Sequence, residues 1–232
     1  METVNIHIKT KKYNDKTILR DIEASYPLSG IHGILGANGS GKTTLFNCMM
    51  GFTDFEGKRT FADMAKIGFL PAELYMYPHI TGNEFISFYL AAKGIKPNEN
   101  EKERYNKLFE LPLSDYAASY STGMLKKLYL MALLLQHNEV LLLDEPFNGL
   151  DYVSVLFLTS ILKTLREQGY TIFVASHAIE HLMSFCDTLS IVKNGGITGY
   201  SSPDEIASQY ELLKQEAEGN IREAFTANSQ NR

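Results

Sequence analysis

The sequence predicts an α/β fold: a mainly parallel sheet covered by helices, an N-terminal antiparallel β subdomain and a small helical insert. Apolar runs of strand length, such as residues 140–143, indicate strands buried on both faces, as in a parallel sheet. Strand-like and helix-like segments alternate on both sides of residues 81–119, which read as two helical stretches with a break between them. Residues 4–8 alternate apolar and polar side chains, which is typical of a strand with one buried face.

Length and composition are those of one globular domain. The chain has 232 residues, 44% of them hydrophobic, with a net charge of −5 and no long basic run. Duplex binding needs clustered Lys and Arg, so no nucleic-acid partner is expected. No apolar stretch approaches the roughly 20 residues that span a bilayer, and residues 128–135 are predicted to be core. Any membrane part must therefore be supplied by another chain.

The expected elements follow one another along the chain with recognisable boundaries. A strand at 16–26 pairs with the first strand as a hairpin, and the insert contains an amphipathic helix, a break at 94–97 and a charged helix. Gly51 is placed to end a helix that starts at Lys42. The remaining predictions are strands at 31–35, 139–143 and 170–175, helices at 42–50, 122–136 and 151–168, and a C-terminal helix and frayed tail over 205–232.

The strongest motif is GANGSGKT at residues 36–43, which matches G-x-x-x-x-G-K-[ST] at every fixed position. Glycines let consecutive backbone N–H groups surround a phosphate, and the positive end of the following helix adds to this attraction. A chance glycine-rich turn is the alternative, but this loop follows a predicted strand and opens a predicted helix. We therefore predict a P-loop NTPase core that binds ATP with Mg²⁺. The expected nucleotide contacts are Gly36, Asn38, Gly39, Ser40, Gly41, Lys42, Thr43 and Thr44, with Lys42 also catalytic and Thr43 a metal ligand.

A second motif, VLLLDEP at residues 140–146, places two carboxylates where a buried strand ends. In a parallel sheet this edge is where ligands bind, beside the phosphate loop. Asp144 can hold Mg²⁺, and Glu145 points differently and can orient or deprotonate the attacking water. A surface turn with two solvated acids is the alternative, which the P-loop upstream disfavours.

From about Val4 to Pro203 the sequence resembles the nucleotide-binding subunits of ABC (ATP-binding-cassette) transporters. NGLD at 148–151 looks like the family's D-loop, and YSTGM at 120–124 resembles its signature, usually LSGGQ. The resemblance implies that Tyr13 stacks on adenine, that His177 is the switch histidine, and that Ser121, Gly123 and Asp151 contact nucleotide. Each residue also has a simpler interpretation. Tyr13 could pack on the hairpin, His177 could be a capping or core histidine, and Ser121 is a natural helix N-cap on any protein.

Two departures from the family pattern affect these expectations. The signature has Thr122 in place of glycine and Met124 in place of glutamine, which is similar to a subgroup of exporter-type subunits. At the Q-loop position, where the family has Gln or Glu, this chain has Ala72, and Glu73 substitutes only if the loop shifts by one residue. Ala72 therefore calls into question how tightly hydrolysis is coupled to transport.

The resemblance implies a mechanism and partners. Two subunits face each other, each ATP lies between one P-loop and the other signature, and closure of the dimer completes the site with Glu145 and His177. The second subunit is a second copy or a paralogue. A separate integral-membrane permease holds the pair on the inner, cytoplasmic face of the membrane and selects the cargo. The signature subgroup favours an exporter; an importer subunit, or a soluble ATPase acting on nucleic acid or ribosomes, is the alternative. The whole chain is expected to be one domain, with a catalytic core at 1–80 and 120–204.

Overall fold

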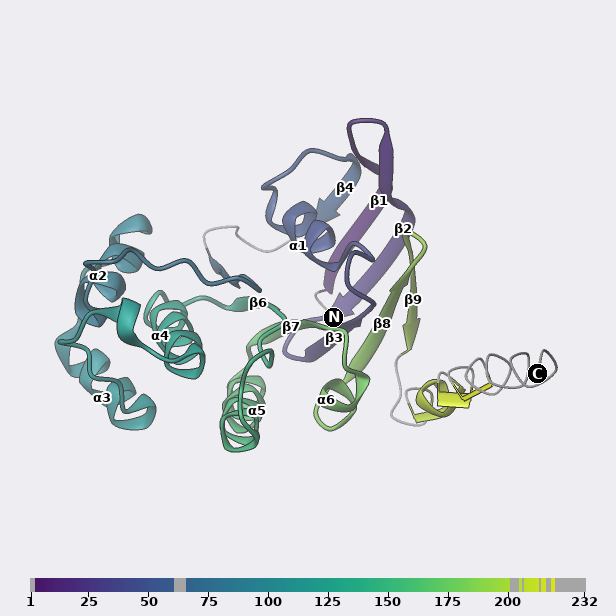
Figure 1. Cartoon of the computed structure of the whole chain (residues 1–232). Helices are drawn as coiled ribbons and strands as arrows, with labels where there is room; N and C mark the ends of the chain where they lie inside the picture. Colours follow the sequence, from purple (N-terminus) through teal and green to yellow (C-terminus); the bar gives the residue numbers. More distant parts are fainter. Residues whose placement is uncertain are drawn as a thin grey trace, which may run out of the picture.

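The computed structural model describes residues 3–60, 66–200, 205, 207–212, 214–215 and 218–219. Its centre is a six-stranded sheet in the order β5-β6-β7-β3-β8-β9, in which all neighbours are parallel except β8 and β9 (Figure 1). This confirms the predicted α/β class. The strands are β3 (Ile31–Leu35), β5 (Ile67–Leu70), β6 (Val140–Asp144), β7 (Thr171–Ser176), β8 (Thr188–Lys193) and β9 (Gly196–Tyr200).

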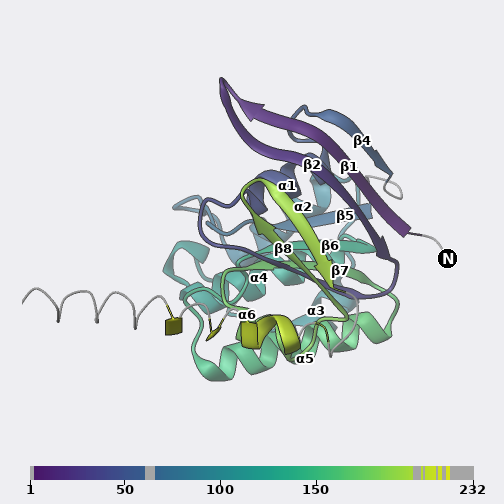
Figure 2. The same ribbon diagram turned by 90° about the vertical axis from the view of Figure 1, so that its right-hand side faces the viewer.

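A second sheet forms the N-terminal part of the molecule. Strands β1 (Thr3–Tyr13) and β2 (Lys16–Pro27) make the predicted hairpin, which closes at the pair Tyr13 and Lys16. A third strand, β4 (Glu56–Thr60), pairs antiparallel on the other side of β1. Figure 2 shows this sheet crossing over one face of the parallel sheet, with α1 (Lys42–Met50) between the two.

The strands of the parallel sheet are buried on both faces, as their apolar composition predicts. In β6, Leu141 and Leu143 face one core while Val140 and Leu142 face the other. The core beneath the antiparallel sheet is completed by α1, whose Leu45, Phe46 and Met49 are fully buried. The opposite core is covered by α4 (Thr122–Leu135), α5 (Tyr152–Glu167) and α6 (Ile179–Met183).

The segment expected as a helical insert contains α2 (Gly82–Ala92), α3 (Glu99–Phe109) and a short 3₁₀ turn, Ala117–Ser119. Its two ends meet, because Thr81 and Tyr116 form an isolated antiparallel bridge. Thr81 also caps α2 through a capping box with Glu84, which fixes where the helix begins. Both helices pack on α4, on the side of the molecule away from the antiparallel sheet (Figure 1).

The sequence did not predict five elements: β4, β5, α6, β8 and β9. Strand β5 has four residues and α6 has five, too few for a clear periodicity. The turn between β8 and β9 consists of Asn194 and Gly195, a residue pair that is typical of two-residue hairpins. Both residues have positive φ, as this type of turn requires.

Within the described residues, no helix is both long enough and apolar enough to cross a membrane. The described residues between 205 and 219 are helical. The rest of the predicted C-terminal helix, and the tail predicted to fray, lie outside the described residues.

Candidate functional site

The glycine-rich loop 36–43 lies between β3 and α1, at the carboxyl edge of the parallel sheet. Gly36 N–H donates to the carbonyl of Ser176 at 3.2 Å, which ties the start of the loop to the end of β7. Gly41 precedes α1 with φ 111° and ψ 8°, a backbone that L side chains rarely adopt, so glycine is required at this close approach to Leu19. Backbone amides of the loop and the N-terminus of α1 therefore face the same space.

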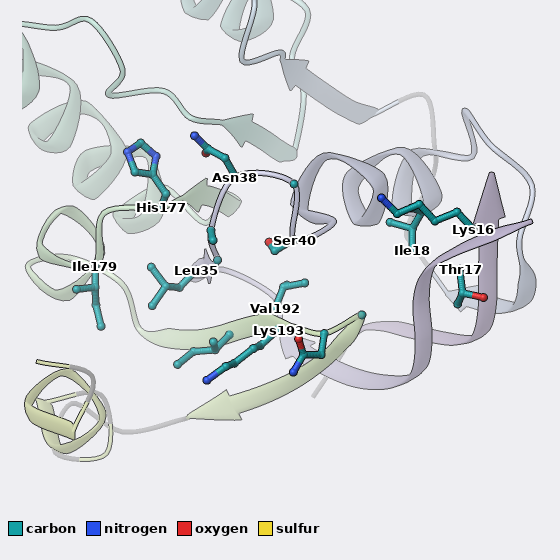
Figure 3. A pocket seen from close by; sticks show the side chains of 16 residues that line it. Lys16, Thr17, Ile18, Leu35, Asn38, Ser40, His177, Ile179, Val192 and Lys193 are labelled. Carbon is teal, nitrogen blue, oxygen red and sulfur yellow. The ribbon is translucent and has the colours of Figure 1, made fainter. Parts of the chain in front are cut away.

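The loop borders a cavity of about 630 Å³, which Figure 3 shows from close by. The cavity also includes residues that were not predicted to belong to a site, from the start of β2 and from the β8–β9 turn. Its lining is mainly apolar, with polar groups that include two lysines, two asparagines and the phosphate-loop backbone, which suits a phosphorylated ligand of nucleotide size. Besides the loop residues 36–40, the lining comprises Lys16, Thr17, Ile18, Leu35, His177, Ile179, Ile191, Val192, Lys193, Asn194 and Gly195.

Lys42 is buried at the first position of α1, with its ammonium group turned back over the loop. It donates to the carbonyl oxygens of Gly36 at 2.7 Å and Ala37 at 3.3 Å. Its third partner is Glu145 Oε1 at 3.1 Å, and both side chains are less than a tenth exposed. A phosphate bound in this loop would lie beside a cation that the protein already holds in place.

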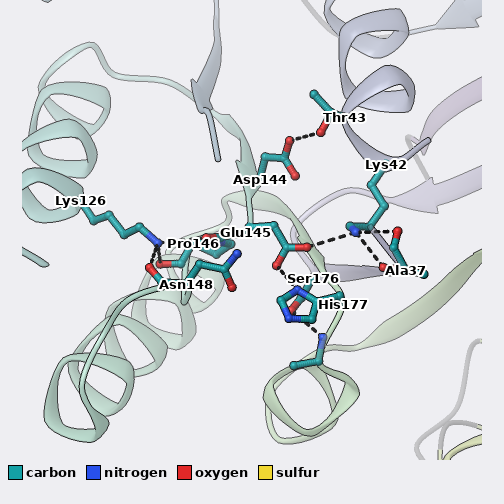
Figure 4. A network of polar contacts seen from close by, with 12 residues as sticks. Ala37, Lys42, Thr43, Lys126, Asp144, Glu145, Pro146, Asn148, Ser176 and His177 are labelled. Carbon is teal, nitrogen blue, oxygen red and sulfur yellow. Dashed lines mark hydrogen bonds and ion pairs between the residues drawn. The ribbon is translucent and has the colours of Figure 1, made fainter. Parts of the chain in front are cut away.

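Thr43 and Asp144 meet across the two elements that carry them, α1 and β6. The Thr43 hydroxyl donates to Asp144 Oδ2 at 2.5 Å, while Asp144 Oδ1 is buried and has no hydrogen-bond partner among the described residues (Figure 4). Burial raises the pKa of Asp144, and the Thr43 hydrogen bond partly offsets this rise. A hydroxyl oxygen next to a carboxylate with a free buried oxygen matches the hard oxygen ligands that Mg²⁺ prefers.

Glu145 connects the phosphate loop to His177. Its Oε2 lies 3.0 Å from His177 Nδ1, and its Oε1 forms the ion pair with Lys42 (Figure 4). Strands β6 and β7 are neighbours in parallel register, with Asp144 opposite Ala175, so residues just after each strand end side by side. A carboxylate and an imidazole in contact at this edge can exchange a proton with a water molecule bound beside them.

Lys126 is a polar residue of this region that sequence reasoning missed. It lies on α4 and is only 5% exposed, and its ammonium group donates to the carbonyl oxygens of Glu145, Pro146 and Asn148 at 3.0, 2.8 and 2.6 Å. Burial lowers the pKa of Lys126 to about 8. A lysine two positions past YSTGM carries no motif, so only the fold reveals these contacts.

The other predicted site residues do not line the cavity. Tyr13 is 45% exposed at the hairpin turn, with the Lys11 ammonium 4.4 Å from its ring centre. Ser121 caps α4 by accepting from Met124 N–H at 3.2 Å, and Asp151 caps α5 by accepting from Ser154 N–H at 2.8 Å. Gly123 lies in the first turn of α4.

The loop after β5 contains the departure noted in the sequence. Ala72 and Glu73 are both exposed, shortly after the carboxyl end of β5. Strand β5 is the neighbour of β6, so this loop emerges at the same sheet edge as Asp144. Among the described residues, no group of three or more His, Cys, Asp or Glu side chains could hold a metal ion by itself. A cation at Asp144 would therefore need oxygen ligands from phosphate and water as well.

A glycine-rich loop that opens a helix, with an Asp at the end of a parallel strand of the same sheet and a Glu just after it, defines a P-loop nucleoside triphosphatase. Comparisons with known proteins narrow this class. A family model described as ABC transporter matches residues 19–148. The chain belongs to this family, whose ATP-binding cassettes bind and hydrolyse ATP.

Individual proteins agree with this membership. An uncharacterized ABC transporter ATP-binding protein of Methanocaldococcus jannaschii is 30% identical over 91% of this chain and 82% of its own length. The lipopolysaccharide export system ATP-binding protein LptB of Acidithiobacillus ferridurans is 26% identical over 84% of this chain and 88% of its own. A solved structure of an ATP-binding subunit of an ABC transporter superposes on this chain with a TM-score of 0.80 at 22% sequence identity. The superposition covers 91% of this chain and 94% of the other, and it supports the fold.

Proposed function

We propose that this chain powers a membrane ABC exporter by ATP-driven closure of a dimer. The observation that carries the proposal is the convergence of Lys42, Glu145 and His177 with the pair Thr43 and Asp144 at one edge of the parallel sheet. In this proposal Lys42 binds the β- and γ-phosphates. Glu145 orients and deprotonates the attacking water, and His177 contacts the γ-phosphate.

Mg²⁺ is the expected metal, held by the Thr43 hydroxyl and the Asp144 carboxylate. The fit rests on Asp144 Oδ1, which is buried, has no hydrogen-bond partner in the part of the chain that the structure describes, and is available to a ligand. When bound, Mg²⁺ would neutralise charge on the phosphates. The chain's own contribution is to fix the two oxygen donors through their mutual hydrogen bond.

The residues outside the cavity are assigned to a composite site. Ser121 and Gly123 begin α4, whose N-terminal amides suit an anion, and Asp151 lies in the loop that packs beside them. We assign them to the γ-phosphate of ATP bound by a second copy or a paralogue. Tyr13 is assigned to adenine stacking, because it is half-exposed at the tip of the hairpin.

A separate permease is the proposed membrane partner. Exposed aromatic side chains gather after β5 and at the end of the insert, where Tyr75, Tyr77 and Tyr116 are 68, 58 and 56% exposed. Such a cluster suits a docked helix of a membrane subunit, which would hold this single-domain chain on the cytoplasmic face. The LptB relative, an ATP-binding protein of a lipopolysaccharide export system, supports the export direction.

The decisive experiment replaces Glu145 with Gln, which keeps the shape but removes the base. We expect the Glu145→Gln variant to lose ATP turnover while still binding ATP, and to form a stable dimer with ATP and Mg²⁺ on a sizing column. A variant that turns over ATP at the wild-type rate would refute the role of Glu145. A variant that is inactive but stays monomeric with ATP would refute the dimer proposal.

A further inference from the structure

The backbone of Glu145 has an unusual conformation. Its φ is 48°, in the left-handed region that disfavours residues other than glycine. A strained residue keeps such a conformation only when its surroundings hold both of its peptide groups. On the amide side, Glu145 N–H donates to the carbonyl of Ala175 on β7 at 2.9 Å. On the carbonyl side, the Glu145 carbonyl oxygen accepts from Asn148 N–H at 3.2 Å and from the Lys126 ammonium group at 3.0 Å.

Lys126 holds more than one peptide group of this loop. Its three carbonyl partners span residues 145–148, so one ammonium group fixes the turn that directly follows the catalytic strand (Figure 4). Hydrogen bonds from a charged donor are stronger than those between neutral groups, and they are stronger still away from water. Without the ammonium group, the carbonyl oxygens of Pro146 and Asn148 would lose this donor.

We propose that Lys126 is a positioning residue for ATP hydrolysis: its ammonium group holds the 145–148 turn, and this turn fixes the Glu145 carboxylate between Lys42 and His177. The inference rests on the proposed role of Glu145 as the base. It adds a residue that contacts neither ATP nor the reacting water, and that acts only through the backbone of the loop.

Lys126 also connects the 145–148 turn to helix α4. The same helix begins at Ser121, which is assigned to the ATP bound by the second subunit. Near that end, a Cβ built on Gly149 would lie 3.3 Å from Thr122 Cγ2, so the helix start and the 148–151 loop are in close contact. A displacement of α4 when the subunits dock would therefore reach the turn after Glu145 through Lys126.

The adjacent Lys127 provides a matched control. It lies on the same helix but points elsewhere: its ammonium group is 3.4 Å from the carbonyl oxygen of Phe109 and 4.5 Å from the ring centre of Phe157. Lys127→Met removes the same charge from the same helix without touching the 145–148 turn. The pair of variants separates a specific effect on Glu145 from a general effect on the helix.

The test measures kcat and KM for ATP hydrolysis in three variants: Lys126→Met, Lys126→Arg and Lys127→Met. Binding of a trinitrophenyl-ATP analogue gives the number of nucleotide-binding sites in each preparation. We expect Lys126→Met to lower kcat on the order of 10- to 100-fold per binding site, as for a slightly misplaced catalytic group, with KM and analogue affinity within about twofold. Lys126→Arg, which keeps a cationic donor, recovers most of kcat. Lys127→Met stays within about twofold of wild type.

Two results would overturn the proposal: a wild-type kcat in Lys126→Met, or a loss of activity that only follows the loss of binding sites. If Lys126→Met does not fold, Lys126→Gln is measured in its place and judged by the same outcomes. Glu145→Gln is assayed in parallel. If that variant is active, the proposed base is wrong; if it is inactive and Lys126→Met is normal, only the role of Lys126 fails.

Discussion

The two positive-φ glycines of the phosphate loop allow a test of how the loop is held. Gly41 has φ 111°, and a Cβ there would lie 2.8 Å from Leu19 Cδ2. Leu19 is fully buried, so its side chain cannot move without disturbing the core beneath the antiparallel sheet. Gly39 has φ 77°, and a Cβ there would meet nothing within 4 Å. The two positions share a positive φ, which would strain any residue with a side chain, but they differ in the space around them.

This difference sets the expected free energies of unfolding. Gly41→Ala combines backbone strain with overpacking, each about 1–3 kcal/mol, and should destabilise by about 2–6 kcal/mol. Gly39→Ala carries only the strain of a left-handed residue, about 1 kcal/mol. For a domain of this size each kcal/mol shifts the melting temperature by about 2–4 °C.

The assay is urea or thermal unfolding without nucleotide, so that contacts to phosphate do not enter the comparison. ATP affinity is measured separately. We expect Gly41→Ala to weaken ATP binding by more than its smaller fraction of folded protein accounts for. Equal destabilisation by the two substitutions, or a larger effect at Gly39, would refute the packing argument. Gly39→Asn serves as a control, since asparagine tolerates the left-handed region, and it should unfold close to wild type.

Two further predictions concern the metal pair and the buried histidine. Thr43→Val removes the hydroxyl that donates to Asp144, and we expect it to raise the Mg²⁺ concentration for half-maximal ATPase activity about tenfold. Thr43→Ser keeps the hydroxyl and should need the same Mg²⁺ concentration as wild type. The same Mg²⁺ dependence in wild type and both variants would contradict the assignment. Burial lowers the pKa of His32 from its ordinary value of 6.5, so protonation favours the unfolded chain and stability should be lost as the pH falls below about 6.5. His32→Gln should flatten this dependence of the free energy of unfolding between about pH 6.5 and 5, and an unchanged slope would disprove the contribution.

Local signals made much of the fold predictable. The P-loop has a fixed spacing, and apolar runs such as 140–143 identify the central strands with an error of about one residue. The edge strands were missed for a physical reason. Strand β4 has the sequence EGKRT, with no apolar side chain, and owes its conformation to pairing with β1 roughly 50 residues earlier.

Most of the candidate site was predicted from residues that lie in motifs, and His177 from the family resemblance and its place just after a predicted strand. Lys42, Thr43, Asp144 and Glu145 were identified because their spacing encodes the phosphate loop and the end of a strand. Contacts that join distant elements carry no such signal, and the three carbonyl partners of Lys126 are the clearest case. Glu145 has an unusual φ that the sequence does not predict, because this φ depends on partners from β7 and α4.

The strand order also bears on how the chain is synthesised. Strand β7 pairs with β6 on one side and with β3 on the other, yet it follows both in the chain. Until residue 176 has left the ribosome, β3 and β6 have no common neighbour, and each exposes an apolar edge that could pair with another chain. A nascent chain that ends between β6 and β7 would therefore be prone to aggregation and proteolysis. Such a chain would also lack His177, so the contact between Glu145 and His177 could not form.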